Sequence, residues 1–397
     1  MGIMHEPDEP RHIACLDVPD FYAALEELRR PELRMRPLVL AEPGPRAVVQ
    51  GVNPTARSEG VREGMLLNQA QRLCRRLQVI PPDYRFYRER HQNIVRELDR
   101  YSPLVEGTLP GHYFIDLTGT ERLWGPSPDV ACRMERHLAQ GMRLHARVGI
   151  ARNKLVSQVA ATCITAGDMG LIFPGAETSF LDPLPVTFLP GVGSKTASRL
   201  ADFNIQSVGQ LAGLGPDALT GVFGNAGHRL SRIARGIDPT PVVPSQNMAK
   251  LSIVRTLDRD EIDRDRLEAF LFQQVEEAGW NLRCHNRFPR HFSLEIRYAD
   301  GVSARCRHQL PPVTVHVDLR LFSMVLPFFR QLFHRRVAVR RLALELFDFT
   351  MPMRQMSLFP WEEASFQEDR RLQKALDGIR TRFGRSAVQW GKVRLSL

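Results

Sequence analysis

The stretch that most constrains the fold is a short strand that ends in an acidic residue and runs into a helix. Residues 11–20 read RHIACLDVPD, and Ile13 to Leu16 form an apolar run of strand length. The run places Asp17 at the end of the strand, and Asp20 is expected to cap the helix that follows. A carboxylate at the end of a central strand holds a catalytic metal in some proteins and caps a turn in others, so the rest of the chain has to decide.

Composition narrows the class of protein. A chain of 397 residues suffices for about two to four domains. Its formal net charge of +10 favours a polyanionic partner, nucleic acid first, although a merely basic protein would show the same excess. The six cysteines are scattered without a CxxC pair, which indicates neither a zinc site nor a disulfide framework and predicts a cytoplasmic location. No apolar run reaches membrane-spanning length, so no membrane partner is expected.

The first part of the chain, to about residue 180, alternates strand and helix patterns. Strands are expected over His112–Leu117 and Ala146–Ala151, and helices over Phe86–Tyr101 and Val130–Met142. This order predicts two helices on one face of a mainly antiparallel sheet.

A different unit begins at Leu181. Residues 189–200, LPGVGSKTASRL, predict a hairpin between two helices, in which Gly191 and Gly193 permit a tight turn. Backbone N–H groups at the start of the second helix, beside Lys195, are suited to hold a phosphate. This helix–hairpin–helix pattern is typical of sequence-independent contact with DNA. A plain αα-hairpin is the alternative.

A proline-rich, polar stretch, residues 236–250, predicts an extended linker to a second α+β unit. The elements expected in that unit are a helix over Asp263–Arg283, strands over Phe292–Tyr298, Val313–Val317 and Val337–Phe349, and a helix over Leu321–Phe333. The unit is rich in arginine, and some of these side chains are expected to be ordinary solvated surface. We expect Arg335, Arg336 and Arg340 to contact a phosphate backbone.

The tail begins near Met351 and contains the pentapeptide QMSLF, Gln355 to Phe359. A helix is expected from about Glu368 to Phe383. One face of that helix is apolar: Leu372, Leu376, Ile379 and Phe383. The pattern leaves open whether this face packs on the second unit or on another protein.

The order of these parts resembles the Y-family translesion DNA polymerases (UmuC/DinB-like) over residues 11–397. The resemblance implies an α+β multidomain chain with right-hand polymerase architecture: a ferredoxin-like palm, small fingers, a helix–hairpin–helix thumb and an α+β little finger. The implied parts are a flexible N-terminus (1–10), palm (11–32 and 78–180), fingers (33–77), thumb (181–240), linker (241–250), little finger (251–350) and tail (351–397).

Several motifs carry the resemblance and imply roles for single residues. LDVPDFYAALEE resembles the first family motif, with Asp17 as a metal-binding carboxylate and Tyr22 as the residue that excludes ribonucleotides. NPTARSEGVREGM and ARNKLVSQVA resemble the fingers and palm motifs, where Arg57 and Lys154 would contact the incoming triphosphate. Pro54 stands where the family usually has a triphosphate-binding tyrosine. Each of these residues could instead have a role outside catalysis. Tyr22 could serve in packing, and Arg57 and Lys154 could contact DNA phosphates.

The chain departs from the family where the chemistry takes place. The second family motif reads roughly Glu-Pro-Leu-Ser-Leu-Asp-Glu-Ala-Tyr-Leu-Asp, whereas residues 106–116 read EGTLPGHYFID. The catalytic Asp–Glu pair therefore falls on Gly111 and His112. Polymerases hold two Mg²⁺ ions with carboxylates, and imidazole is a poor Mg²⁺ ligand. We expect Mg²⁺ to bind weakly, if at all, at the residual carboxylate Asp17, and we expect no catalytic residue.

Other acids do not replace the missing pair in this interpretation. Asp116 lies four residues beyond His112, which is roughly 13 Å along a strand, and Glu106 lies about as far away in the other direction. The alignment predicts that Gly111→Asp with His112→Glu would restore Mg²⁺ binding at least in part.

The tail adds a second implied partner. Gln355, Leu358 and Phe359 resemble the bacterial sliding-clamp-binding pentapeptide. A degenerate core with an internal clamp motif and a C-terminal extension resembles the ImuB type, which is thought to join the clamp to another error-prone polymerase in SOS mutagenesis. Three functions stay open: a non-catalytic adaptor on damaged or primer–template DNA, an active translesion polymerase with an unorthodox metal site, and a regulator that only binds DNA and the clamp.

Overall fold

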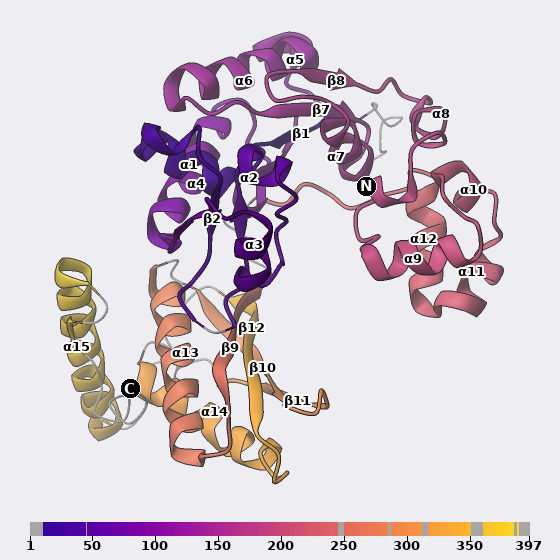
Figure 1. Ribbon diagram of the computed structural model, residues 1–397. Helices are drawn as coiled ribbons and strands as arrows, with labels where there is room; N and C mark the ends of the chain where they lie inside the picture. Colours follow the sequence, from indigo (N-terminus) through magenta and orange to yellow (C-terminus); the bar gives the residue numbers. More distant parts are fainter. Residues whose placement is uncertain are drawn as a thin grey trace, which may run out of the picture. The chain divides into compact units, whose positions relative to one another are not determined.

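The chain forms two compact units, residues 1–247 and 248–397, in a computed structural model (Figure 1). The structure describes residues 11–44, 46–244, 250–284, 287–311, 317–350, 360–384 and 387–388. Each unit has its own sheet and hydrophobic core, and each is described by itself. Within the described part of the chain, no helix is both long and apolar enough to span a bilayer.

The first unit is built on a five-stranded sheet with the order β5-β6-β1-β7-β8. Its strands are β1 (Ile13–Asp17), β5 (Val105–Leu109), β6 (His112–Asp116), β7 (Arg147–Ala151) and β8 (Met169–Leu171). β1 is antiparallel to both of its neighbours, and the register places Asp17 opposite His112 on β6 and Arg147 on β7. The strands expected near residues 112 and 146 are confirmed.

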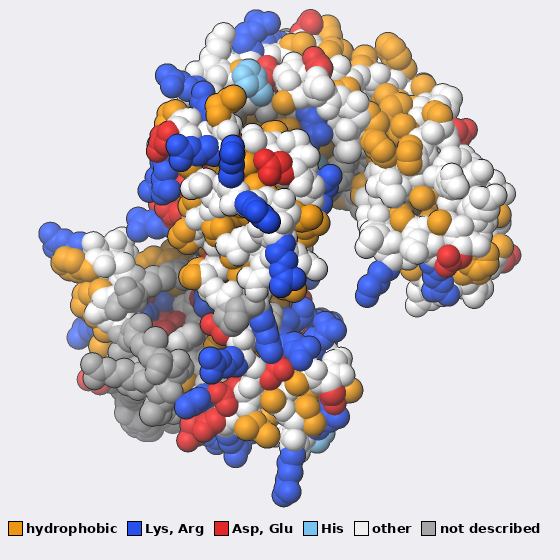
Figure 2. Space-filling view, in the orientation of Figure 1, with side chains coloured by type: hydrophobic (Ala, Val, Ile, Leu, Met, Phe, Trp, Pro, Cys, Tyr) orange, Lys and Arg blue, Asp and Glu red, His pale blue; other side chains and the backbone are white. Residues whose placement is uncertain are grey.

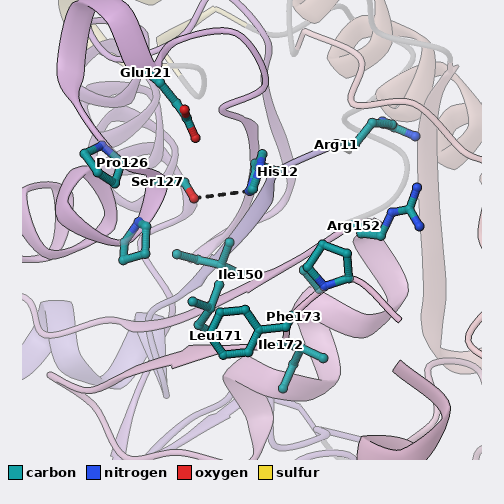
Figure 3. A pocket seen from close by; sticks show the side chains of 13 residues that line it. Arg11, His12, Glu121, Pro126, Ser127, Ile150, Arg152, Leu171, Ile172 and Phe173 are labelled. Carbon is teal, nitrogen blue, oxygen red and sulfur yellow. Dashed lines mark hydrogen bonds between the residues drawn. The ribbon is translucent and has the colours of Figure 1, made fainter. Parts of the chain in front are cut away.

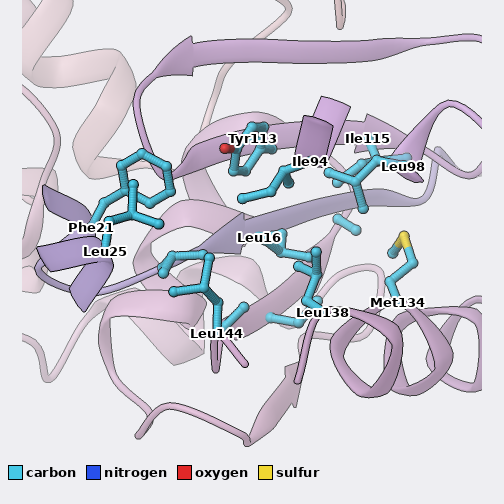
Figure 4. Close-up of a cluster of buried hydrophobic side chains, with 14 of the residues drawn as sticks. Leu16, Phe21, Leu25, Ile94, Leu98, Tyr113, Ile115, Met134, Leu138 and Leu144 are labelled. Carbon is cyan, nitrogen blue, oxygen red and sulfur yellow. The ribbon is translucent and has the colours of Figure 1, made fainter. Parts of the chain in front are cut away.

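Helices α4 (Tyr84–Leu98) and α6 (Ser127–Met142) cover one face of this sheet, as expected. Leu16 of β1 points toward them and packs with Ile94 and Met134 (Figure 4). Helices α1 (Phe21–Arg29) and α5 (Glu121–Trp124) flank this layer, and α7 (Lys154–Thr162) lies on the opposite face. A Cβ atom at Gly149 would lie 2.1 Å from the carbonyl oxygen of Ser157, so β7 and α7 approach each other closely only because this residue is glycine.

A small separate core lies beside this sheet. It is formed by a three-stranded sheet in the order β3-β2-β4, with two short helices and a 3₁₀ turn. The elements are η1 (Pro31–Leu33), β2 (Leu38–Leu40), β3 (Gly51–Val52), α2 (Pro54–Ser58), α3 (Leu67–Leu73) and β4 (Gln78–Ile80). Helix α3 ends at Leu73, because Cys74 already adopts an extended conformation.

Five helices and a 3₁₀ turn complete the first unit around a core that includes Leu200, Leu211 and Leu230. They are α8 (Glu177–Leu181), η2 (Val186–Phe188), α9 (Ser194–Asp202), α10 (Val208–Ala212), α11 (Pro216–Phe223) and α12 (Asn225–Ala234). The hairpin of the LPGVGSK motif joins η2 to α9.

The second unit is a four-stranded antiparallel sheet, ordered β11-β10-β12-β9, with two helices on one face. Its elements are β9 (Lys250–Glu261), α13 (Arg264–Cys284), β10 (Phe288–Tyr298), β11 (Ser303–Gln309), α14 (Asp318–Leu332) and β12 (Val339–Thr350). The sequence patterns missed β9 and β11. Residues 313–316 of the strand expected over Val313–Val317 lie outside the described residues. Helix α14 passes through Pro327 without a break, and α15 (Pro360–Phe383) follows.

Candidate active site and nucleic-acid interface

Asp17 lies at the end of β1 between cationic or basic side chains of both neighbouring strands. Arg147 Nη2 is 2.8 Å from Asp17 Oδ2, and His112 Nδ1 is 3.6 Å from Asp17 Oδ1. The three side chains are each about a quarter exposed or less, so solvent screens the Asp17–Arg147 pair only in part. The residual carboxylate is thus neutralised by a guanidinium of its own sheet.

Arg147 is the site residue that the sequence patterns missed. It is the first residue of the strand RVGIA, where a charged residue ordinarily marks the solvated end of a strand. Only the β1–β7 register, which pairs Asp17 with Arg147, shows that its side chain reaches the carboxylate. That register depends on contacts between segments about 130 residues apart, so no local signal was available.

Cys15 lies beneath this group and adds no ligand. Its Sγ is 3.9 Å from both ring nitrogens of His112. Burial raises the pKa of the Cys15 thiol well above its usual value, because a thiolate would be desolvated there. Cys15 therefore stays a protonated thiol, which is neither a nucleophile nor a good metal ligand.

Gly111 occupies the turn between β5 and β6 in a conformation that a side chain disfavours. Its φ is +87°, and a Cβ atom there would lie 2.6 Å from Cβ of Phe21. The Gly111 carbonyl accepts a hydrogen bond of 2.7 Å from the Val18 N–H, which holds the turn in place. An aspartate at this position would require the hairpin or Phe21 to move, so restored Mg²⁺ binding by Gly111→Asp with His112→Glu stays a prediction that depends on such a movement.

Asp20 does not cap α1, contrary to the expectation from the sequence. Its backbone is left-handed, with φ of 51°, and its side chain makes no capping hydrogen bond. Instead the Asp20 carboxylate accepts a hydrogen bond from Arg57, which also lies 3.9 Å from Glu63. Burial raises the pKa of Asp20, and Arg57 opposes that rise. The cation expected at the triphosphate is therefore held by carboxylates of the chain.

Lys154 is paired in the same manner. Its Nζ lies 2.8 Å from both carboxylate oxygens of Glu106 and 4.8 Å above the ring of Phe114. Glu106 Oε2 also accepts a hydrogen bond from the Val243 N–H, and Lys154 donates weakly to the Pro241 carbonyl. Glu106 and Lys154 thus tie the chain that leaves α12 to the five-stranded sheet.

Tyr22 packs against another aromatic ring, and Pro54 begins a helix. The ring of Tyr22 packs against Tyr87 with centroids 4.7 Å apart, and burial raises the pKa of its hydroxyl. Pro54 is the first residue of α2, where its missing N–H costs nothing. Asn53 caps that helix through a 2.9 Å hydrogen bond to the Ala56 N–H.

The donor set does not match a two-metal centre. Among the described residues, no three or more His, Cys, Asp or Glu side chains are grouped so that they could hold a metal ion. Asp116 lies opposite Ile13, at the far end of β1 from Asp17, and its carboxylate is 3.8 Å from Arg11. Asp116 and His112 are the two ends of strand β6, in agreement with the spacing expected from the sequence.

The hairpin of the LPGVGSK motif presents backbone donors to solvent. Gly191 has a φ of +86°, and Gly193 is the N-cap of α9. Gly193 and Lys195 are exposed. Arg229 packs over Gly191, where a Cβ atom would lie 2.4 Å from its Nη2. A cavity of about 600 Å³ beside the hairpin is lined by further basic side chains, including Lys154, His228 and Arg232.

The three arginines singled out in the second unit differ in their partners. Arg335 pairs with Asp300 at 2.7 Å, and Arg340 pairs with Asp260 at 3.0 Å. Arg336 is exposed and makes no ion pair with any described residue. Four further arginines lie on the sheet face opposite α13 and α14: Arg297, Arg305, Arg307 and Arg341. Lysine and arginine side chains outnumber acidic ones on the visible surface (Figure 2). Gln355, Leu358 and Phe359 lie outside the described residues.

A second cavity lies at the opposite end of β1 from Asp17 and contains none of the expected site residues. It measures about 220 Å³, with an apolar floor that includes Ile150 and Leu171. Arg11 and Arg152 lie at its edge, and His12 and Ser127 are joined by a hydrogen bond inside it (Figure 3).

Comparison with known proteins accounts for this arrangement. Residues 16–162 match the impB/mucB/samB family, residues 250–358 match the C-terminal domain of that family, and residues 187–238 match the thumb domain of DNA polymerase iota. A DNA polymerase IV of Caulobacter vibrioides is 30% identical over 395 residues, covering 98% of this chain and 96% of the relative. The chain belongs to the Y-family of DNA polymerases.

Other Y-family members show the same extent of similarity. A DNA polymerase IV of Ralstonia nicotianae is 31% identical, over 88% of this chain and 98% of the relative. Among solved structures, a chimeric Y-family DNA polymerase superimposes with a TM-score of 0.73 at 20% identity, covering 86% of this chain and 99% of the other. An insertion ternary complex of Dbh DNA polymerase gives 0.64 at 21% identity, with the same coverage. The right-hand polymerase architecture is thereby confirmed.

Proposed function

We propose that this chain is a Y-family member that binds primer–template or damaged DNA without polymerase chemistry and acts there as an adaptor. The contact between Arg147 and Asp17 carries this proposal, because a guanidinium 2.8 Å from the residual carboxylate repels a divalent cation. The family's two-metal reaction needs carboxylates around both ions. Gly111 and His112 supply none, so the donors present do not fit two Mg²⁺ ions, and Mg²⁺ binding is weak at most.

The thumb hairpin and the second unit support the DNA-binding part. Gly193 and Lys195 are exposed at the start of α9, where N–H groups and the helix dipole favour a phosphate. Arg336 is exposed as well, and Arg335 and Arg340 would exchange a carboxylate for a phosphate on binding. Dbh DNA polymerase shares this fold in an insertion ternary complex and in a post-insertion binary complex.

The adaptor part rests on the tail. Gln355, Leu358 and Phe359 would occupy the peptide pocket of a bacterial sliding clamp, and the recruited protein would be another error-prone polymerase. In this account Tyr22, Arg57 and Lys154 are vestigial nucleotide-binding residues that now serve packing and ion pairing.

The test uses the full-length protein, a labelled primer–template and the purified sliding clamp. Fluorescence anisotropy should show DNA binding by the wild type and by a variant with Gln355→Ala, Leu358→Ala and Phe359→Ala. Only the wild type and the control Ser357→Ala should form the larger complex with the clamp. Extension by an added error-prone polymerase should rise if the chain is an adaptor. A fall would identify it instead as a regulator that competes for the clamp.

Asp20 favours a second candidate, an active polymerase. Burial is the main cause that raises the pKa of Asp20, and the charge of Asp17, three residues earlier in the chain, adds to it, so Asp20 is a second carboxylate next to the end of β1. Relatives of similar length are named DNA polymerase IV. Activity would then require Arg57 and Arg147 to release both carboxylates to a metal.

A further inference from the structure

Helix α15 is attached to the second unit by polar side chains. The Gln373 amide donates to Asp318 Oδ2 at 3.0 Å, and its oxygen accepts from the Asp318 N–H at 3.2 Å. Asp377 accepts from Arg283 Nε of α13 at 2.6 Å. Gln373 is buried in this contact. The helix therefore docks through hydrogen bonds and ion pairs.

The centre of this attachment is the fully buried carboxylate of Asp318. Arg283 donates to it at 2.6 Å, and Arg380 of α15 lies 3.7 Å from it. Gly279 of α13 makes room, because a Cβ atom there would lie 2.1 Å from Asp318 Oδ1. Buried charges are costly unless they are paired, and removing one partner leaves the other uncompensated. The network accordingly holds α15 in one orientation.

That orientation turns the apolar stripe of the helix outward. Leu372, Ile379 and Phe383 are 51%, 40% and 68% exposed, and Leu376 is half-buried at the edge. These residues follow the spacing of one helical face. The sequence left open which surface this face would cover. The structure shows that the described part of the second unit leaves most of it uncovered.

The charged side chains of α15 are divided unevenly between its two sides. Asp369 and Asp377 face the second unit, where they pair with Arg320 and Arg283. Three basic residues remain exposed beside the stripe: Arg371, Lys374 and Arg382. Over residues 368–384 the outward surface of α15 is therefore apolar and mainly basic, with Glu368 as an exposed acidic residue, whereas the inward surface is polar and carries Arg380 together with the two aspartates.

We propose that this outward surface docks into an apolar groove with an acidic rim on another protein. An amphipathic helix lays its apolar face into such grooves, anchored by residues at this spacing, and basic flanks are complementary to an acidic rim. A second copy of the chain would bring Arg371 and Arg382 close to the same residues of its partner, and like charges oppose that contact. DNA would pair with the basic residues but would leave Leu372, Ile379 and Phe383 in water. The role of this surface in recruitment rests on the proposed adaptor function. The outward orientation of the apolar stripe is observed independently of that function.

The first step of the test is to place a benzophenone amino acid at position 379 of the full-length protein in its source cell. The protein that crosslinks is identified, purified and titrated against the full-length chain. Ile379→Asp with Phe383→Asp should lower its affinity by about 10- to 100-fold, as expected for anchor side chains. Leu123→Asp, at an apolar position 81% exposed in the first unit, is the matched control and should leave the affinity unchanged. Affinity should also fall with salt.

Other outcomes would overturn the proposal. These are the absence of any crosslinked protein, a crosslinked dimer of this chain, a DNA adduct, or an affinity that Ile379→Asp leaves unchanged. Far-ultraviolet circular dichroism and primer–template binding of the same variants show that they are folded. If the protein binds DNA and the clamp normally but no protein binds the apolar stripe of α15, this inference is overturned and the proposed function is left intact.

Discussion

The centre of the five-stranded sheet and the thumb hairpin differ in how their charged side chains are paired. At the sheet, Arg147, Arg57 and Lys154 are each bound to a carboxylate of the chain. At the hairpin, Gly193 and Lys195 remain exposed to solvent. The first region has neutralised its own charges, whereas the second keeps its charges available for a ligand. One fold can thus keep charged groups paired within the chain in one region and exposed to solvent in another.

The largest effect is expected from the packing of α7 on the five-stranded sheet. Gly149→Ala should lower the free energy of unfolding by about 3 kcal/mol or more, because the added methyl group would meet the backbone of α7. Gly141→Ala, where nothing lies within 4 Å, is the matched control and should change stability by about 1 kcal/mol or less. Urea unfolding measures both. Equal free energies of unfolding for the two variants would contradict the close approach of β7 and α7 at Gly149.

A smaller effect is expected from pH. Burial lowers the pKa of His91 to about 4 from 6.5, and its Nδ1 lies 2.9 Å from the Tyr113 hydroxyl. The unfolded chain binds this proton more readily, so stability should be full above about pH 6.5 and should fall as the pH drops toward 4. The loss from this residue is as much as about 3 kcal/mol. Unfolding of His91→Gln at several pH values should show a flatter dependence, and an unchanged slope would contradict the assignment.

The smallest effect is expected on DNA affinity, when one lysine is removed from each of the two regions. Lys195→Ala should weaken primer–template binding by about 2- to 10-fold and lower the salt slope by about 1, because one phosphate contact is lost. Lys154→Ala should leave DNA affinity unchanged, since Glu106 already holds that ammonium group. Anisotropy titrations at several salt concentrations measure both. Equal losses would show that Lys154 is as available to DNA as Lys195.

Local patterns predicted the sheet, its two covering helices and the hairpin, because each has a clear apolar period or turn signal. Strand β9 was missed because charged residues interrupt its alternation and most of its side chains are exposed. The partners of Asp17 and Asp20 depend on Arg147 and Arg57, which the fold brings from distant segments. The outward orientation of α15 was likewise hidden, since it depends on the buried Asp318.

The central claim is that this Y-family chain binds DNA but does not extend it. The most direct measurement is primer extension on undamaged and abasic templates with the full-length protein, first with Mg²⁺ and then with Mn²⁺. The account predicts no extension above that of Asp17→Ala, together with primer–template binding that both proteins retain. Extension that Asp17→Ala abolishes would contradict the account, because Asp17 would then have exchanged Arg147 for a metal ion.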